Sequence, residues 1–199
     1  MSGIDLFAAT TGGRLGARRL ACTAGLVLAA GLGTSAGQDI DSTPLVREDR
    51  GVYTVAATFG VSGPTATALA TLTDYEEIPR FMPAVRTSRI LARGDGEWIV
   101  EQEAVATFMW FSKRIHLTLD VREHSGTIRF VDRCGRSFER YEGIWMVTDR
   151  NGRTIVEYRL SAKPSFDVPA FVLKRLLKRD ASQMIGQLQT EIAARTAGR

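Results

Sequence analysis

Side chains that could carry out acid–base or metal chemistry are few and scattered in this chain of 199 residues. Its two histidines, His116 and His124, are too few for a typical histidine-based metal site. His116 and Asp120 would share one face of a strand and could form a catalytic pair, although polar neighbours on a solvated sheet face commonly have no catalytic role. No metalloprotease, serine hydrolase or phosphate-loop motif occurs. The sequence therefore predicts no catalytic residue, no metal site and no cofactor, and favours a binding protein over an enzyme.

One carboxylate lies where a polar group is unexpected. In a predicted C-terminal helix, Asp180 falls between Leu176 and Met184 on the apolar side. Burying an unpaired carboxylate is costly, so this side chain must form an ion pair, accept hydrogen bonds or face a water-filled pocket. Two interpretations stay open: a structural ion pair with an arginine of the sheet, or a contact with the polar head of a ligand.

Aromatic and other apolar residues are more informative, because many of them are predicted to face the inside of a curved sheet. They could fill a solid core. A single helix, however, cannot fill the space above a strongly curved sheet with its own side chains, so together these residues favour a cavity for an apolar ligand. The predicted lining comprises Phe81, Met82, Trp98, Trp145, Tyr158, Leu160, Leu173, Leu177, Asp180 and Met184.

The elements that would position these side chains follow from the spacing of apolar residues. A first strand at 52–59 precedes a helix at 66–72 and a second short helix, which Asp74 could cap and Pro79 and Pro83 would end. Apolar and polar residues then alternate through six further strands, and an amphipathic helix follows Pro169. These six strands are predicted at 85–93, 97–107, 111–122, 127–133, 138–148 and 153–163.

The closing helix decides the fold class. Its apolar side must pack on a large apolar surface, and the concave face of the sheet is the only candidate. The sequence therefore predicts an α+β protein with a helix-grip fold, in which a curved antiparallel sheet wraps around the long C-terminal helix and two short helices follow the first strand. The apolar side comprises Leu173, Leu176, Leu177, Met184 and Leu188.

The stretch from Thr73 to Pro83 resembles the signature of the START-like (SRPBCC) polyketide cyclase/dehydrase family, and is closest in pattern to the coenzyme-Q-binding START domain proteins. In that family a tyrosine opens a short helix, and an aromatic residue followed by a proline ends it, as Tyr75, Phe81 and Pro83 would here. Gly143-Ile144-Trp145 resembles the Gly-x-Trp of the family's penultimate strand. The resemblance implies the same helix-grip fold around an internal cavity for a small apolar ligand.

The N-terminus is typical of an exported protein. Arg14, Arg18 and Arg19 precede an uncharged run at 20–36 that is rich in small and apolar residues, which predicts a signal peptide cleaved near Ala36. An uncleaved N-terminal anchor is the alternative. We expect a signal peptide at 1–36, a flexible polar leader at 37–50 and one START-like domain at 51–196, with the mature protein periplasmic or secreted.

Cleavage there would also change the charge and the cysteine content. It removes three arginines and one aspartate, which lowers the formal net charge from +4 by two. The basic composition is therefore largely a targeting signal, and it predicts no nucleic-acid partner. Cys22 is lost with the signal, so Cys134 has no intramolecular disulfide partner.

A carrier that holds a hydrophobic small molecule, such as a lipid or a quinone, is the function that these features favour. A polyketide cyclase/dehydrase-type enzyme that recruits Tyr158, Arg159 or Asp180 is a second class. An interaction module resembling ribosome-association toxins is a third, which the signal peptide disfavours. The basic side of the closing helix could contact a membrane transiently or could simply be solvated. It comprises Lys174, Arg175, Lys178 and Arg179.

Overall fold

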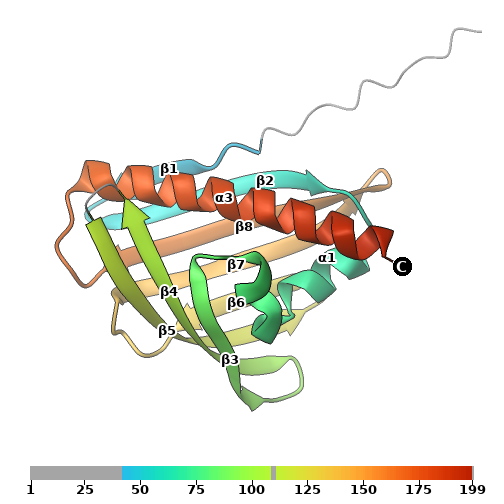
Figure 1. Ribbon diagram of the computed structural model, residues 1–199, viewed down its shortest axis with the longest axis horizontal. Coiled ribbons are helices and arrows are strands. Elements are labelled where there is room, and N and C mark those ends of the chain that lie inside the picture. The colour runs from blue at the N-terminus through green and yellow to red at the C-terminus, as the bar shows by residue number, and fades with distance from the viewer. Residues whose placement is uncertain (1–41, 109–110, 199) are drawn as a thin grey trace, which may run out of the picture. The chain divides into compact units, whose positions relative to one another are not determined.

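An antiparallel sheet of eight strands curves around one long helix in the part of the chain that the structure describes (Figure 1). This computed structural model describes residues 42–108 and 111–198. The strand order is β1-β2-β8-β7-β6-β5-β4-β3, so β1 and β3 form the two edges. In chain order the elements are β1 (Leu45–Asp49), β2 (Val52–Val61), α1 (Thr65–Leu72), η1 (Tyr75–Glu77), α2 (Ile78–Phe81), β3 (Val85–Arg93), β4 (Glu97–Phe108), β5 (Phe111–His124), β6 (Thr127–Asp132), β7 (Phe138–Arg150), β8 (Arg153–Pro164) and α3 (Ala170–Ala197).

The helix-grip fold predicted from the sequence is confirmed. The bounds of every predicted strand lie within two residues of those observed, because period-two alternation runs through most of them, although register shifts interrupt it in β3 and β7. In β5, the apolar side chains at odd positions from Ile115 to Val121 are buried on the concave face, whereas the polar ones between them lie on the outer face. The same alternation in most of the other strands gives the sheet one apolar side for α3 to cover.

Strand β1 corrects the prediction of a flexible leader at 37–50. Residues Leu45–Asp49 pair antiparallel with β2, from Leu45 opposite Ala56 to Asp49 opposite Val52. Arg50 and Gly51 both have positive φ, +47° and +78°, which is the backbone of a tight two-residue hairpin turn. The leader prediction is wrong for these residues because a five-residue edge strand shows little periodicity. The other predicted signal-peptide and leader residues before 42 lie outside the described residues.

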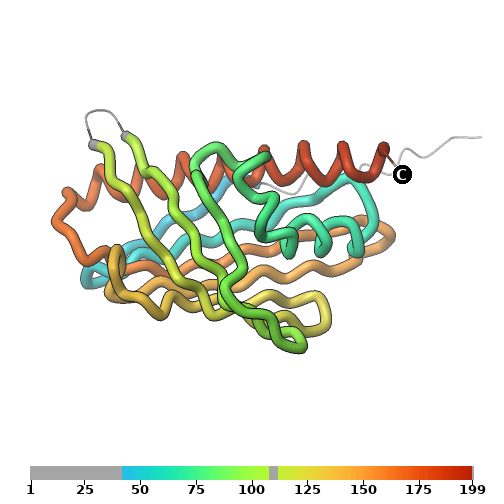
Figure 2. Tube along the Cα trace, turned by 60° about the horizontal axis from the view of Figure 1, so that its bottom comes forward, coloured from blue at the N-terminus to red at the C-terminus, as the bar shows by residue number. Residues whose placement is uncertain are grey.

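Helix α3 lies along the concave side of the sheet, and α1 and the η1–α2 segment lie beside its C-terminal half (Figure 2). Its C-terminal half contributes Ile185, Leu188 and Ile192 to the core, each 2% exposed or less. Closer to its start, Leu173 and Leu176 pack with Tyr53 of β2 in a second, smaller cluster. Within the described residues, no helix combines the length and the hydropathy that a membrane span requires.

An ion network around the buried Glu191 joins the end of α3 to the short helices. Glu191 accepts hydrogen bonds from Arg195 Nε at 2.6 Å and from Arg80 Nη2, and Arg195 Nη1 donates to Asp74 Oδ2 at 2.9 Å. Asp74 therefore binds Arg195 instead of capping the short helix as predicted, since no side chain caps η1. Burial alone would raise the pKa of Glu191, but the hydrogen bonds from Arg195 and Arg80 outweigh it and lower that pKa.

Candidate ligand cavity

Between α3 and the concave face of the sheet lies an apolar cavity with two adjoining chambers. The outer chamber, below the first half of α3, has a volume of about 530 Å³. The inner chamber, next to α1 and the η1–α2 segment, has a volume of about 160 Å³. The two chambers adjoin, since six side chains line both of them. These shared side chains are Met82, Val85, Gln102, Tyr141, Tyr158 and Met184.

Nine of the ten side chains predicted to line a cavity do so. Phe81 and Trp145 line the inner chamber, and Met82, Tyr158 and Met184 line both. The predicted residues that line only the outer chamber are Leu160, Leu173, Leu177 and Asp180.

Trp98 is the predicted side chain that lies elsewhere. It is on the concave face, but it precedes Gln102 by four residues, which is about 13 Å along a strand. There its indole packs against the ring of Tyr75, with the ring centroids 6.0 Å apart, and under the guanidinium of Arg93 at 5.6 Å. Tyr75 thus separates Trp98 from the cavity. The prediction for Trp98 is wrong. Alternation predicts on which face of the sheet a side chain lies, but it does not predict which other element packs against that side chain.

Among the lining residues that the sequence prediction missed, Tyr141 and Gln102 are two that the alternation places correctly. Tyr141 lies two residues before Gly143 and four before Trp145, so all three share the concave face of β7. Gln102 shares the concave face of β4 with Val100, and its Nε2 donates to Ser88 Oγ at 3.1 Å. A polar side chain on an apolar strand face was the signal in both cases.

The polar side chains that line both chambers are Gln102, whose amide binds Ser88, and the phenols of Tyr141 and Tyr158. Burial raises the pKa of Tyr141, with a smaller contribution from the negative charge of Asp132, to about 12. Burial also raises the pKa of Tyr158 well above its ordinary value. Both phenols are therefore neutral near pH 7 and can donate hydrogen bonds.

At the side of the outer chamber, Asp180 pairs with its own neighbour in α3. Its Oδ1 accepts hydrogen bonds from Arg179 Nε at 3.0 Å and Nη2 at 2.7 Å. Arg179 Nη2 also donates to the backbone carbonyl of Thr107 in β4. The predicted partner, an arginine of the sheet, is thus wrong, although the pair does connect the helix to the sheet. Burial raises the pKa of Asp180, and the opposing effect of Arg179 is smaller.

The family follows from a comparison of the whole chain with known families. A family model described as polyketide cyclase/dehydrase and lipid transport matches residues 61–189, which is more than half of the chain. The chain belongs to this family. The START-like resemblance drawn from Thr73–Pro83 is thereby confirmed, whereas the closeness to coenzyme-Q-binding members stays a prediction. No curated protein matches the sequence.

Solved structures agree on the fold of this polyketide cyclase and lipid transport family member. A protein from Thermus thermophilus has a TM-score of 0.62 at 18% identity, covering 72% of this chain and 99% of that one. The Zhui aromatase/cyclase from Streptomyces sp. R1128 has a TM-score of 0.63 at 14% identity, covering 72% and 95%. A STAR-related lipid transfer protein from Xanthomonas axonopodis has a TM-score of 0.57 at 14% identity, covering 75% and 98%. Identities this low show a shared fold alone.

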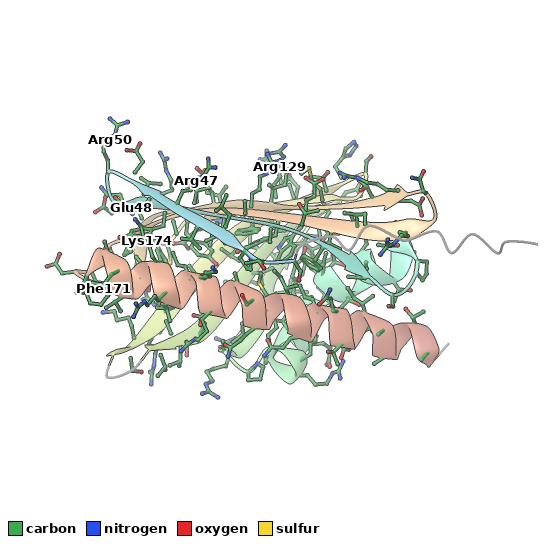
Figure 3. The ribbon with its side chains drawn as sticks, turned by 90° about the horizontal axis from the view of Figure 1, so that it is seen from above. Arg47, Glu48, Arg50, Arg129, Phe171 and Lys174 are labelled. Atoms are coloured by element: carbon green, nitrogen blue, oxygen red, sulfur yellow. The ribbon has the colours of Figure 1, made fainter. Side chains whose placement is uncertain are left out.

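In this family member the basic side of α3 is divided among different partners. Lys174 Nζ lies 3.5 Å from Glu48 Oε2 of β1, and Arg179 is bound to Asp180 and Thr107. Arg175 and Lys178 are exposed without a described partner. Of the four cations that the sequence predicts to form an outward stripe, only Arg175 and Lys178 are thus exposed without a partner among the described residues. On the same helix, Phe171 in the first turn of α3 is 59% exposed (Figure 3).

The remaining candidate catalytic groups lie on the outer face of the sheet. His116 Nδ1 is 3.2 Å from Glu103 Oε1 on the neighbouring strand, while Asp120 pairs with Arg133 at 3.3 Å instead of with His116. Arg159 lies 3.8 Å from Glu157, and its side chain is 65% exposed. None of these groups lines either chamber. Within the described residues, no group of three acidic, cysteine or histidine side chains could hold a metal ion.

Proposed function

We propose that this domain is a carrier that takes up a hydrophobic small molecule, such as a lipid or a quinone, into the cavity under α3. The observation that carries the proposal is the pair of adjoining chambers, about 530 and 160 Å³, whose walls are largely apolar. Removing apolar ligand surface from water contributes about 2.5 kcal/mol for each ~100 Å² buried. Such walls therefore favour uptake by partition, without a covalent step.

The chemistry of the polar lining supports a carrier over a cyclase-type enzyme. A general acid or base works best with a pKa near the operating pH. Tyr158, the phenol that an enzyme of this family would recruit here, has its pKa raised away from neutrality, and so does Tyr141. Arg159 lies on the outer face, and Asp180 is bound to Arg179. These groups can orient a bound molecule, but they are poorly matched to moving protons near pH 7.

Export and membrane contact belong to the same proposal. The basic and apolar N-terminus supports release outside the cytoplasm. Apolar cargo must pass between the cavity and a lipid bilayer, and an exposed aromatic beside free cations suits an anionic lipid surface. Phe171, Arg175 and Lys178 form such a group at the first turns of α3, the helix that covers the outer chamber. We propose that this group touches the membrane during exchange.

Native mass spectrometry of gently purified protein tests the carrier directly, with solvent extraction of the same sample to identify what it holds. We expect a mass in excess of the polypeptide that collisional activation removes, and a lipid or quinone in the extract. Delipidated protein should then take up a fluorescent neutral lipid or a quinone from solution. Protein that purifies without cargo and takes up neither probe would rule out a carrier role.

A further inference from the structure

Two hydroxyl groups that line the cavity, those of Tyr141 and Tyr158, have no hydrogen-bond partner among the described residues. Tyr158 is 5% exposed, yet neither its hydroxyl nor that of Tyr141 forms a hydrogen bond with any described residue. Both side chains line both chambers. Of the described side chains, the buried polar atom without a partner is Trp98 Nε1, so the two hydroxyls face open cavity space in which a ligand atom could accept their hydrogen bonds. In contrast, the third tyrosine of the inner chamber, Tyr75, donates to Glu123 Oε1 at 2.5 Å.

The rings that carry these hydroxyls are held in place by aromatic neighbours. The ring of Tyr158 lies against that of Trp145, with centroids 4.2 Å apart and an angle of 30° between the planes. Tyr141 packs against Phe138 at 4.9 Å and Phe130 at 5.9 Å. These contacts fix the two rings before a ligand arrives, so little order has to be gained on binding.

Gly143 keeps space for this arrangement. It lies on the concave face of β7 between Tyr141 and Trp145, where a Cβ atom would be 2.4 Å from Phe130 Cζ and 2.6 Å from the backbone oxygen of Arg159. Any larger residue would therefore displace Phe130, and with it the support of Tyr141. The Gly-x-Trp pattern of this strand thus positions one member of the hydroxyl pair.

The charges around the cavity limit what these hydroxyls could bind. None of the described residues that line the inner chamber carries a charge. In the outer chamber the charged lining residues are Arg179 and Asp180, which are paired with each other. A carboxylate buried here would have no free cation to neutralise it, whereas a neutral carbonyl oxygen needs only a donated hydrogen bond.

We propose that Tyr141 and Tyr158 form a recognition point that donates hydrogen bonds to a neutral carbonyl oxygen of the cargo. The inference rests on the proposed carrier function. It predicts that the cavity prefers neutral oxygenated molecules, such as quinones, ketones or esters, to pure hydrocarbons and to free fatty acid anions. The aromatic walls contribute affinity for any flat apolar body, and the hydroxyl pair contributes the selectivity for oxygen.

Two probes with the same three-ring skeleton test this point, 9,10-anthraquinone with two carbonyl oxygens and anthracene with none. Delipidated protein is titrated with each, and quenching of the tryptophan fluorescence reports binding. We expect Tyr141→Phe and Tyr158→Phe each to weaken anthraquinone binding about fivefold and to leave anthracene binding unchanged, since one hydrogen bond is lost in the first case and none in the second. Both variants should melt no lower than the wild type, because the lost hydroxyl has no protein partner.

Tyr75→Phe is the matched control, because it removes the same oxygen from the same chamber where that oxygen already binds Glu123. It should leave the ratio of the two affinities unchanged. If the tyrosine variants weaken both probes equally, or neither, the recognition point is wrong and the carrier stands. If the wild type binds neither probe and purifies without cargo, the carrier function fails as well.

Discussion

Filling the outer chamber from α3 should weaken ligand binding without unfolding the domain. Leu177 lines this chamber and is only half-buried, so Leu177→Trp places an indole into open space. We expect its free energy of unfolding to change by less than about 0.5 kcal/mol, as for substitutions that disturb no packed neighbour. If the indole covers about 60 Å² of wall that a ligand would otherwise touch, the loss is about 1.5 kcal/mol at 25 cal/mol per Å², or roughly tenfold in affinity.

Ile185 provides the comparison on the same helix. It is 2% exposed and packs in the solid core, outside both chambers. Ile185→Trp overpacks that core and should cost about 1–3 kcal/mol. For a domain of this size the loss lowers the Tm by about 2–12 °C.

Thermal melts and probe titrations of the two variants give the answer together. Leu177→Trp should melt with the wild type and bind anthraquinone about tenfold more weakly, while Ile185→Trp should melt lower. Equal destabilisation of both variants would refute the reasoning, because it would mean that the space around Leu177 is packed. Unchanged uptake by a stable Leu177→Trp would place the ligand elsewhere.

Three further outcomes follow from the structure and the sequence. The raised pKa of Asp180 means that folding favours its protonated form, so this stabilisation is complete below the ordinary pKa of 3.8 and is lost as the pH rises through the folded-state pKa. Asp180→Asn should remove that slope in denaturant titrations between pH 3 and pH 7. Replacing Arg175 and Lys178 with glutamine should weaken binding to phosphatidylserine vesicles about 30-fold at low salt, at about 1 kcal/mol for each charge, and Phe171→Ala should weaken it further. Intact-mass analysis of the exported protein should show the loss of about the first 36 residues.

Each of these outcomes has a result that contradicts it. An identical pH slope in Asp180→Asn would mean that other groups cause the dependence. For the vesicles, the control replaces Arg140 and Lys163, which pair with Glu142 and Glu139 on the sheet. Equal losses in the control and in the α3 variant would show an effect of net charge alone. Full-length protein found only in the cytosol would contradict export.

The order and bounds of the elements could be predicted because alternation and amphipathicity are local patterns. Strand β1 was missed since five residues at a sheet edge show too few repeats of the pattern. The cavity lining was largely predictable for the same reason, apart from Trp98, whose covering residue Tyr75 belongs to another element. Side-chain partners were not predictable. Lys174 binds Glu48 and Arg179 reaches Thr107 only because the fold brings distant segments together.

The ion network around the buried Glu191 holds the C-terminal end of α3 against the short helices. Arg80, Arg195 and Asp74 fix the last turns around Glu191, whereas the first turns lie over the larger chamber. Leu173 precedes Glu191 by 18 residues, or about 27 Å of helix. A tilt of about 10° around Glu191 would therefore raise the helix at Leu173 by about 5 Å, while the region of Glu191 hardly moves. Such a tilt would also have to separate Leu173 and Leu176 from Tyr53 and Lys174 from Glu48, so we expect cargo to pass beside Phe171 only when these contacts break.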